Sequence, residues 1–474
     1  MRTLPALTVG AALCASLMAP AVHAQPTTEG LNFIVIYTDD QGYNDLGSYG
    51  SPYIRTPHLD KMADEGIRFT DFYVMSGKCS PSRAALLTGS YPRRVSMQYR
   101  VVMDRDKHGL HPDEVTIAKQ LKKAGYRTSL IGKWHLGHAE PALLPLNQGF
   151  DSFFGLPYSN DMKLSPLLTL SPDYVRRPDD APGVHFQKRG NPQGVLMEGN
   201  EVIEYPTDQS MLTQRLTERA IDFITQDSND PFFLYLAHPM PHVPVDASPA
   251  FKGKSAFGPY GDAVEELDWS VGEILNTLKA HDLADNTVVV YASDNGPWGY
   301  GEAPDARVGR ADPLRGSKGS QYEGGFRVPA LIWAPKFIAP KVHEGIVSNM
   351  DLLPTFSKLA GVPLPADRPI DGVDIWPLLT SPDTQVSSHE AIYFYESRHG
   401  TMAGVRWEDW KYLEIAEERN GPKVPQLYNL KTDIAESNNL ISKHPERAAT
   451  MKAMMARFDA RMEQEARPHF VSQQ

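Results

Sequence analysis

LNFIVIYTDD, residues 31–40, joins an apolar run to two consecutive carboxylates. A short apolar run of this kind is typical of a fully buried strand. Similar runs follow at 128–131, 232–237, 287–292 and 328–333, and segments with helical periodicity lie between them. This alternation predicts an α/β domain built on a largely parallel sheet.

Helix signals lie between the expected strands. Thr56 is placed to cap a helix that starts at Pro57 and closes at Gly66. Apolar residues also share one helical face within 212–224 and within 267–278. Residues 160–206 are rich in proline, glycine and charge, so we expect a long surface excursion there.

The C-terminal part has a different pattern. Strand-like pieces at 391–395, 404–405 and 410–415 precede a helical tail at 445–463. We expect a small antiparallel sheet packed by a terminal helix. The predicted units are a signal peptide at 1–24, a catalytic α/β domain at 25–382 and a small α+β subdomain at 383–474.

The N-terminus predicts export. Arg2 precedes an apolar run from 4 to 18, and Ala24 ends a small-residue cleavage site, so the mature chain is expected to begin at Gln25. Leucine before Cys14 disfavours a lipoprotein signal. No later run is long enough to span a bilayer. The chain also has no Asn-x-Ser/Thr sequon, which favours a bacterial periplasm or medium.

The net charge argues against some classes of partner, and the cysteine content singles out one residue. The 47 Lys and Arg residues against 58 Asp and Glu residues give a net charge of −11, which argues against nucleic acid or an anionic membrane as a general partner. Of the two cysteines, Cys14 leaves with the signal peptide. Cys79 is then a lone thiol in an oxidising compartment, where it must be buried, modified or catalytic.

Hard oxygen ligands follow two of the expected strands. Asp39 and Asp40 end the first, and Asp294 with Asn295 ends another. Ligands of open α/β sheets bind beyond the carboxyl ends of strands, so these pairs should meet in one crevice. Three carboxylates and an amide oxygen suit Ca²⁺ or Mg²⁺ better than zinc. The alternative is that each pair caps a turn.

Cys79 opens a segment with a helix-start signal. Cys79 or Ser80 lies near the cap and Pro81 in the first turn, so the side chain of Cys79 would lie in the positive field of a helix N-terminus, with Arg83 one turn on. The alternative is a buried structural cysteine.

The segment CSPSR at 79–83, with LTG at 87–89, resembles the signature by which sulfatases have this cysteine oxidised to formylglycine. Further matching segments cover nearly the whole mature chain: TDD at 38–40, GKWHLG at 132–137, GF at 149–150, PH at 241–242, SDNG at 293–296, GSKG at 316–319 and YEGG at 322–325. Their order is most similar to the arylsulfatase A and N-acetylgalactosamine-6-sulfatase branch.

The resemblance implies an alkaline-phosphatase-like fold, with a large, mixed, mostly parallel sheet flanked by helices. It implies one Ca²⁺ ion held by Asp39, Asp40, Asp294, Asn295 and the formylglycine (3-oxoalanine) made from Cys79. The implied catalytic residues are Cys79, Arg83, Lys133, His135, His242 and Lys318, and the implied substrate-binding residues are Ser159, Lys133, His242 and Lys318. A formylglycine-generating maturation enzyme is the implied partner.

The implied reaction is hydrolysis of a sulfate monoester by the formylglycine hydrate. One hydroxyl of the diol attacks sulfur to form a sulfo-enzyme intermediate, and the other then expels sulfate. His242, with Lys318, would protonate or stabilise the leaving alkoxide, and His135 would take the proton of the second hydroxyl. The three cations and the ion leave the pocket electropositive in an acidic protein.

Two other functions fit parts of the pattern. A phosphomonoester, phosphodiester or phosphonate hydrolase of the same fold would use similar carboxylates, although the maturation signature and Lys133 and Lys318 favour one metal and sulfate. A catalytically silent protein that binds sulfated glycans would be expected to lose the nucleophile, which this chain keeps. The expected substrate is a sulfated sugar or an aryl sulfate, with specificity from residues 160–206, 298–315 and the C-terminal subdomain.

Overall fold

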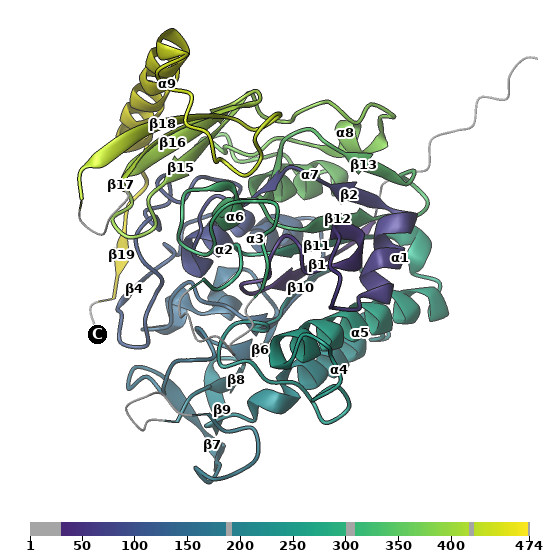
Figure 1. The fold of residues 1–474 in the computed structure, drawn as a ribbon. Coiled ribbons are helices and arrows are strands. Elements are labelled where there is room, and N and C mark those ends of the chain that lie inside the picture. The colour runs from purple at the N-terminus through teal and green to yellow at the C-terminus, as the bar shows by residue number, and fades with distance from the viewer. Residues whose placement is uncertain (1–29, 186–191, 300–308, 417–420, 473–474) are drawn as a thin grey trace, which may run out of the picture.

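A computed structural model describes residues 30–185, 192–299, 309–416 and 421–472. The predicted signal peptide lies outside these residues. The described chain forms a large sheet with helices on both faces and a small four-stranded sheet beside it, as shown in Figure 1. The predicted fold class is therefore confirmed.

The large sheet has eleven strands. In spatial order they are β13 (Lys341–His343), β2 (Ile67–Phe69), β12 (Ala330–Trp333), β11 (Thr287–Ser293), β1 (Asn32–Thr38), β10 (Phe232–Ala237), β5 (Arg127–Lys133), β6 (Ser152–Leu156), β8 (Leu196–Glu198), β9 (Glu201–Tyr205) and β7 (Thr169–Arg176). Its centre, from β11 through β6, is parallel. β12 runs antiparallel to β11, and β8 runs antiparallel to β6 and β9, so the sheet is mixed.

Both faces of the central strand β1 are buried because its side chains alternate between two cores. Phe33, Val35 and Tyr37 pack in one core, with side chains of α2 (Cys79–Thr88), α3 (Ile117–Lys122) and α7 (Leu352–Leu359). Ile34 and Ile36 pack in the other, with α1 (Pro57–Glu65), α4 (Leu212–Ile224) and α5 (Pro259–Ala280). The unbroken apolar run at 31–38 thus reflects a strand covered on both sides.

The start of α1 differs from the prediction. Pro57 is its first residue, as expected, but the side chain of Thr56 makes no capping hydrogen bond. Instead, the Asp268 carboxylate on α5 accepts hydrogen bonds from the backbone amides of His58 (3.2 Å) and Leu59 (2.8 Å). A residue from another helix therefore caps α1, which local sequence signals do not reveal.

The expected surface excursion at 160–206 is only partly a loop. It contains β7, β8 and β9, which extend the edge of the main sheet beyond β6. β7 is mostly exposed and β8 has only three residues, so neither produces a buried apolar pattern in the sequence. The predicted surface excursion therefore contains regular structure.

The C-terminal sheet comprises β15 (Ala391–Tyr395), β16 (Met402–Trp407), β17 (Trp410–Ala416) and β18 (Lys423–Asn429), all antiparallel. The sequence did not predict β18. Helix α9 (Pro445–Gln464) covers this sheet through Met451 and Met455, which pack on Val405, Tyr412 and Leu427. The chain then returns to the large domain, where β19 (Phe470–Val471) pairs with β4 (His108–Gly109).

Candidate active site

The two predicted oxygen-ligand pairs lie together. β1 and β11 are parallel neighbours, so the residues that follow them leave the same edge of the sheet. Asn295 Nδ2 donates to Asp40 Oδ1 at 2.7 Å, and the Asp40 amide donates to Asp294 Oδ1 at 3.2 Å. Asp39 and these three residues are fully buried. Asp40 has a positive φ of 64°, which ends the extended strand abruptly.

Cys79 is the first residue of α2, which ends at Gly89 in a left-handed conformation. Its sulfur lies 3.4 Å from Asp39 Oδ1 and 3.2 Å from Lys318 Nζ. The side chain is buried, and burial together with the charges of Asp294 and Asp39 raises the pKa of the thiol. Because thiolate is the reactive form, the unmodified thiol is a poor nucleophile here.

Two buried cations contact the carboxylates from one side. Arg83 Nε and Nη2 lie 2.9 and 2.8 Å from Asp294 Oδ2. Lys133 Nζ donates to Asp39, and also to Ser159 Oγ at 3.2 Å. Arg83 comes from α2 and Lys133 from the end of β5. The helix that carries Cys79 and the ends of three strands, β1, β5 and β11, thus supply one charged cluster.

A third cation arrives from a distant loop. Lys318 Nζ lies 2.6 Å from Asp40 Oδ1, and it lies 4.9 Å from the centre of the Trp298 ring. Burial would lower the pKa of Lys318, but Asp40 and the neighbouring negative groups raise it well above its usual value. Lys318 is therefore held as an ammonium.

The cluster shifts the pKa values of Asp39 and Asp294 in opposite directions. Burial alone would raise the pKa of Asp39, but Lys133 and the other nearby cations hold it well below its usual value. Burial and the charge of Asp39 raise the pKa of Asp294 to about 7. A bound cation would favour the ionised form of each carboxylate.

The two histidines have defined ring orientations. His135 Nε2 lies 2.9 Å from the carbonyl oxygen of Val102, which can only accept, so this nitrogen carries the proton. The buried Nδ1 of His135 has no hydrogen-bond partner among the described residues. Burial, Lys133 and Arg83 lower the pKa of His135 well below its usual value. His135 is thus a neutral imidazole with an available lone pair.

His242 lies beside the carboxylates. Its Nδ1 faces Asn160 Oδ1 at 3.1 Å and Ser159 Oγ at 3.5 Å, and its Nε2 lies 3.6 Å from Asp40 Oδ2. Burial and Lys318 lower the pKa of His242. The ring orientation therefore directs Nε2 toward the cluster that surrounds Cys79.

The residues at this site fit a divalent cation. Ligand atoms of Asp39, Asp40, Cys79 and His242 lie within 4.8 Å of one another. Asn295 Oδ1 is buried without a hydrogen-bond partner among the described residues, so it is available as a ligand. Carboxylate and amide oxygens of this kind favour Ca²⁺ or Mg²⁺. This group includes His242, which was not predicted as a ligand, and it does not include Asp294, which was.

Sequence reasoning missed two residues at the site. Asn160 orients His242, and the Trp298 ring packs edge-on against His242 at 5.3 Å between centroids. The sequence signals were only their positions, next to Ser159 and shortly after Asn295. His238, four positions before His242, is bonded to Ser270 of α5 at 3.2 Å.

The sulfatase family model matches residues 31–362, and a model for the C-terminal part of N-sulphoglucosamine sulphohydrolase matches residues 317–465. The chain belongs to the sulfatase family. Human arylsulfatase A is 40% identical over 381 residues, which cover 79% of this chain and 72% of that protein. N-acetylgalactosamine-6-O-sulfatase of Bacteroides thetaiotaomicron is 31% identical and covers 88% of this chain and 90% of its own length.

Solved structures agree with this sulfatase fold. A Bacteroides thetaiotaomicron structure described with the metabolism of multiple glycosaminoglycans has a TM-score of 0.77 at 28% identity and covers 92% of this chain and 100% of that one. A Pseudoalteromonas sulfatase has a TM-score of 0.76 at 28% identity and covers 93% and 92%. A phosphonate monoester hydrolase from Silicibacter pomeroyi, at 20% identity and a TM-score of 0.62, shares the fold alone.

The predicted resemblance is therefore confirmed, and this sulfatase is a sulfuric ester hydrolase. Its substrates are sulfated molecules. Among the described residues, no helix has both the length and the apolar character required to cross a membrane.

Proposed function

We propose that this sulfatase hydrolyses a sulfate monoester of a carbohydrate or an aryl alcohol, with formylglycine formed from Cys79 as the nucleophile. The observation that carries the proposal is the position of Cys79, buried between Asp39 and Lys318 at the start of α2.

Formylglycine at position 79 would supply two hydroxyls on one carbon, one to attack sulfur and one to release sulfate. Ca²⁺ held by Asp39, Asp40, Asp294, Asn295 and position 79 would supply a Lewis acid that lowers the pKa of the nucleophile and stabilises charge on sulfate. The unpartnered oxygen of Asn295 supports such a ligand set.

The buried cations would bind the sulfate group. The ammonium of Lys133 is paired with Asp39, and the ammonium of Lys318 is paired with Asp40. The guanidinium of Arg83 is paired with Asp294. These groups are already oriented before substrate binds, so they stabilise developing negative charge without reorganisation. Ser159, held by Lys133 at 3.2 Å, completes the substrate-binding residues.

The histidines would move protons. His135 is a neutral base with a buried, unpartnered Nδ1. We therefore assign it the role of accepting the proton that is released during sulfate elimination. His242 presents Nε2 near Lys318 and Asp40. We therefore assign His242 and Lys318 the role of protonating or stabilising the leaving oxygen of the ester. Trp298 contacts both His242 and Lys318, and we infer that it borders the alcohol part of the substrate.

The same proposal includes export of the chain and modification of Cys79. We infer that residues 1–24 direct export to the periplasm or medium, and that a formylglycine-generating enzyme modifies Cys79 before folding, because the folded chain buries this side chain. We retain 25–382 as the catalytic domain and 383–474 as the C-terminal subdomain. Sequencing the N-terminus of the exported protein tests the first inference, since a start other than Gln25 would contradict it.

The test is the ratio of kcat/KM on 4-nitrophenyl sulfate to kcat/KM on 4-nitrophenyl phosphate, with protein coexpressed with a maturation enzyme. We expect a strong preference for sulfate that disappears in the Cys79→Ala variant. A preference for phosphate, or activity that survives Cys79→Ala, would favour the phosphohydrolase alternative instead.

A further inference from the structure

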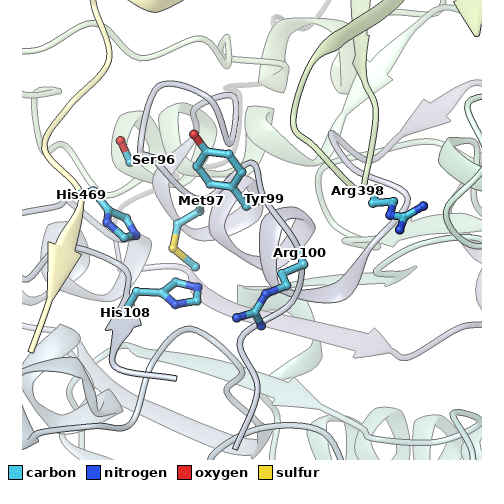
Figure 2. A pocket seen from close by; sticks show the side chains of 7 residues that line it. All are labelled: Ser96, Met97, Tyr99, Arg100, His108, Arg398 and His469. Carbon is cyan, nitrogen blue, oxygen red and sulfur yellow. The ribbon is translucent and has the colours of Figure 1, made fainter. Parts of the chain in front are cut away.

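A second pocket lies where the catalytic domain meets the C-terminal subdomain. Its volume is about 300 Å³, and it is lined by four separate parts of the chain, which Figure 2 shows together. Tyr99 and Arg100 come from the loop after α2, His108 comes from β4, and Arg398 comes from the turn between β15 and β16. His469 comes from the C-terminal tail just before β19.

Four of the side chains that line this pocket are basic: Arg100, His108, Arg398 and His469. Arg100 is paired with Asp106 through contacts of 2.6 and 2.8 Å, so its charge is partly neutralised. The exposed guanidinium of Arg398 makes no hydrogen bond or ion pair within the part of the chain that the structure describes. Arg398 therefore offers an unpaired, planar donor group, which suits an anion with several oxygens.

An aromatic ring accompanies these cations. Tyr99 is 50% exposed, although a large aromatic side chain usually buries more of its surface. A tyrosine ring offers a flat apolar face and a hydroxyl, which match a sugar ring that carries hydroxyl groups. Beside Arg100 and Arg398, this ring favours a ligand that is both a sugar and an anion.

The loop that forms this pocket also supports the active site. Val102 donates its backbone N–H to Ser80 Oγ at 3.0 Å, and its carbonyl oxygen lies 2.9 Å from His135 Nε2. Arg100 is two residues away, a separation of at most about 7 Å along the chain. One loop, residues 99–102, therefore lines the pocket at one end and holds His135 at the other.

We propose that the pocket lined by Tyr99, Arg100 and Arg398 binds a second, sulfated sugar unit of an oligosaccharide whose sulfate ester occupies the active site. This inference rests on the proposed function, and it specifies the substrate as a chain that carries more than one sulfate. A small aryl sulfate would fill the active site alone.

Binding is tested with the Cys79→Ala protein and tetrasaccharides from heparin, chondroitin 6-sulfate and κ-carrageenan, by isothermal titration calorimetry. We expect at least one of these to bind. Adding Tyr99→Ala and Arg398→Gln should weaken its binding by about tenfold or more. Arg457→Gln, which removes an exposed arginine of α9 outside the pocket, is the matched control and should change nothing.

A parallel assay separates this inference from the proposed function. With Cys79 restored and matured, Tyr99→Ala and Arg398→Gln should leave kcat/KM on 4-nitrophenyl sulfate unchanged. Absence of this hydrolysis in the wild type would contradict the proposed function, not the pocket. The pocket assignment is overturned if none of the tetrasaccharides binds, if the double substitution binds as tightly as its parent, or if aryl sulfate hydrolysis falls equally.

Discussion

The ammonium of Lys318 lies 3.2 Å from the sulfur of Cys79, although 239 positions separate the two residues in the chain. Lys318 comes from the loop before α6 (Glu323–Phe326), and Cys79 begins α2. Both residues lie within residues 31–362, the region that the sulfatase family model matches.

Lys318→Met is expected to lower kcat/KM on 4-nitrophenyl sulfate by about 100-fold or more, because it removes a fixed charge from the cluster around Asp40 and Cys79. Lys336→Met, at an exposed lysine, is the control. A loss of less than about threefold in the first variant would place Lys318 outside the catalytic cluster.

Calcium is expected to stabilise the folded protein. After chelation, adding Ca²⁺ to about 100 times its Kd should raise the free energy of unfolding by about 2.7 kcal/mol. Asn295→Ala should reduce this gain, because it removes the unpartnered buried oxygen, whereas Asn276→Ala on the exposed side of α5 should not. Thermal unfolding that does not respond to Ca²⁺ would contradict the assigned site.

A buried charge network joins the C-terminal sheet to the loop that carries Lys318. Lys411 on β17 lies 2.8 Å from Glu323 and 3.1 Å from Glu436, and all three are fully buried. Lys411→Met should lower the free energy of unfolding by about 3–5 kcal/mol, because it leaves the buried carboxylate of Glu436 without its cation, whereas Glu323 keeps Arg327 at 3.3 Å. Urea titration measures this loss. Lys411→Met with Glu436→Gln should recover part of it, and equal losses in both variants would contradict the network.

Stability is expected to fall between about pH 4 and pH 7 through Asp268. Burial raises the pKa of Asp268 to about 7, despite its hydrogen bonds to Leu59 and His58. In the unfolded chain this group ionises near its usual value, so its contribution is complete below that pH and is lost as the pH rises through about 7. The loss is at most about 4 kcal/mol.

Asp268→Asn keeps an oxygen to cap α1 but cannot ionise, so its free energy of unfolding should change less between pH 4 and pH 8 than that of the wild type. Urea titrations at each pH make the comparison. Asp282→Asn, at an exposed residue, is the control. Parallel pH profiles for the wild type and Asp268→Asn would refute the assigned role.

Central strands and motif residues were predictable because their signals are local. The prediction of residues 232–237 matches β10 residue for residue, since a strand covered on both faces is uniformly apolar. The meeting of Asp40 with Asp294 and Asn295 followed from a general rule about parallel strand ends.

The remaining features depend on contacts that the local sequence does not encode. β7 is largely exposed and joins the edge of the sheet by backbone pairing, which leaves no apolar pattern. The capping of α1 by Asp268 requires α5 to pack beside it. Trp298 belongs to the site because its ring lies beside His242 and Lys318, and the local sequence does not reveal these contacts.

The most direct test of the central claim is the aldehyde content of residue 79, measured by mass spectrometry of its peptide, alongside the specific activity on 4-nitrophenyl sulfate. Preparations made with and without a maturation enzyme provide a range of aldehyde content. We predict that activity rises in proportion to the aldehyde fraction and falls to background where residue 79 is entirely cysteine. Full activity in protein that retains an unmodified Cys79 would contradict the account.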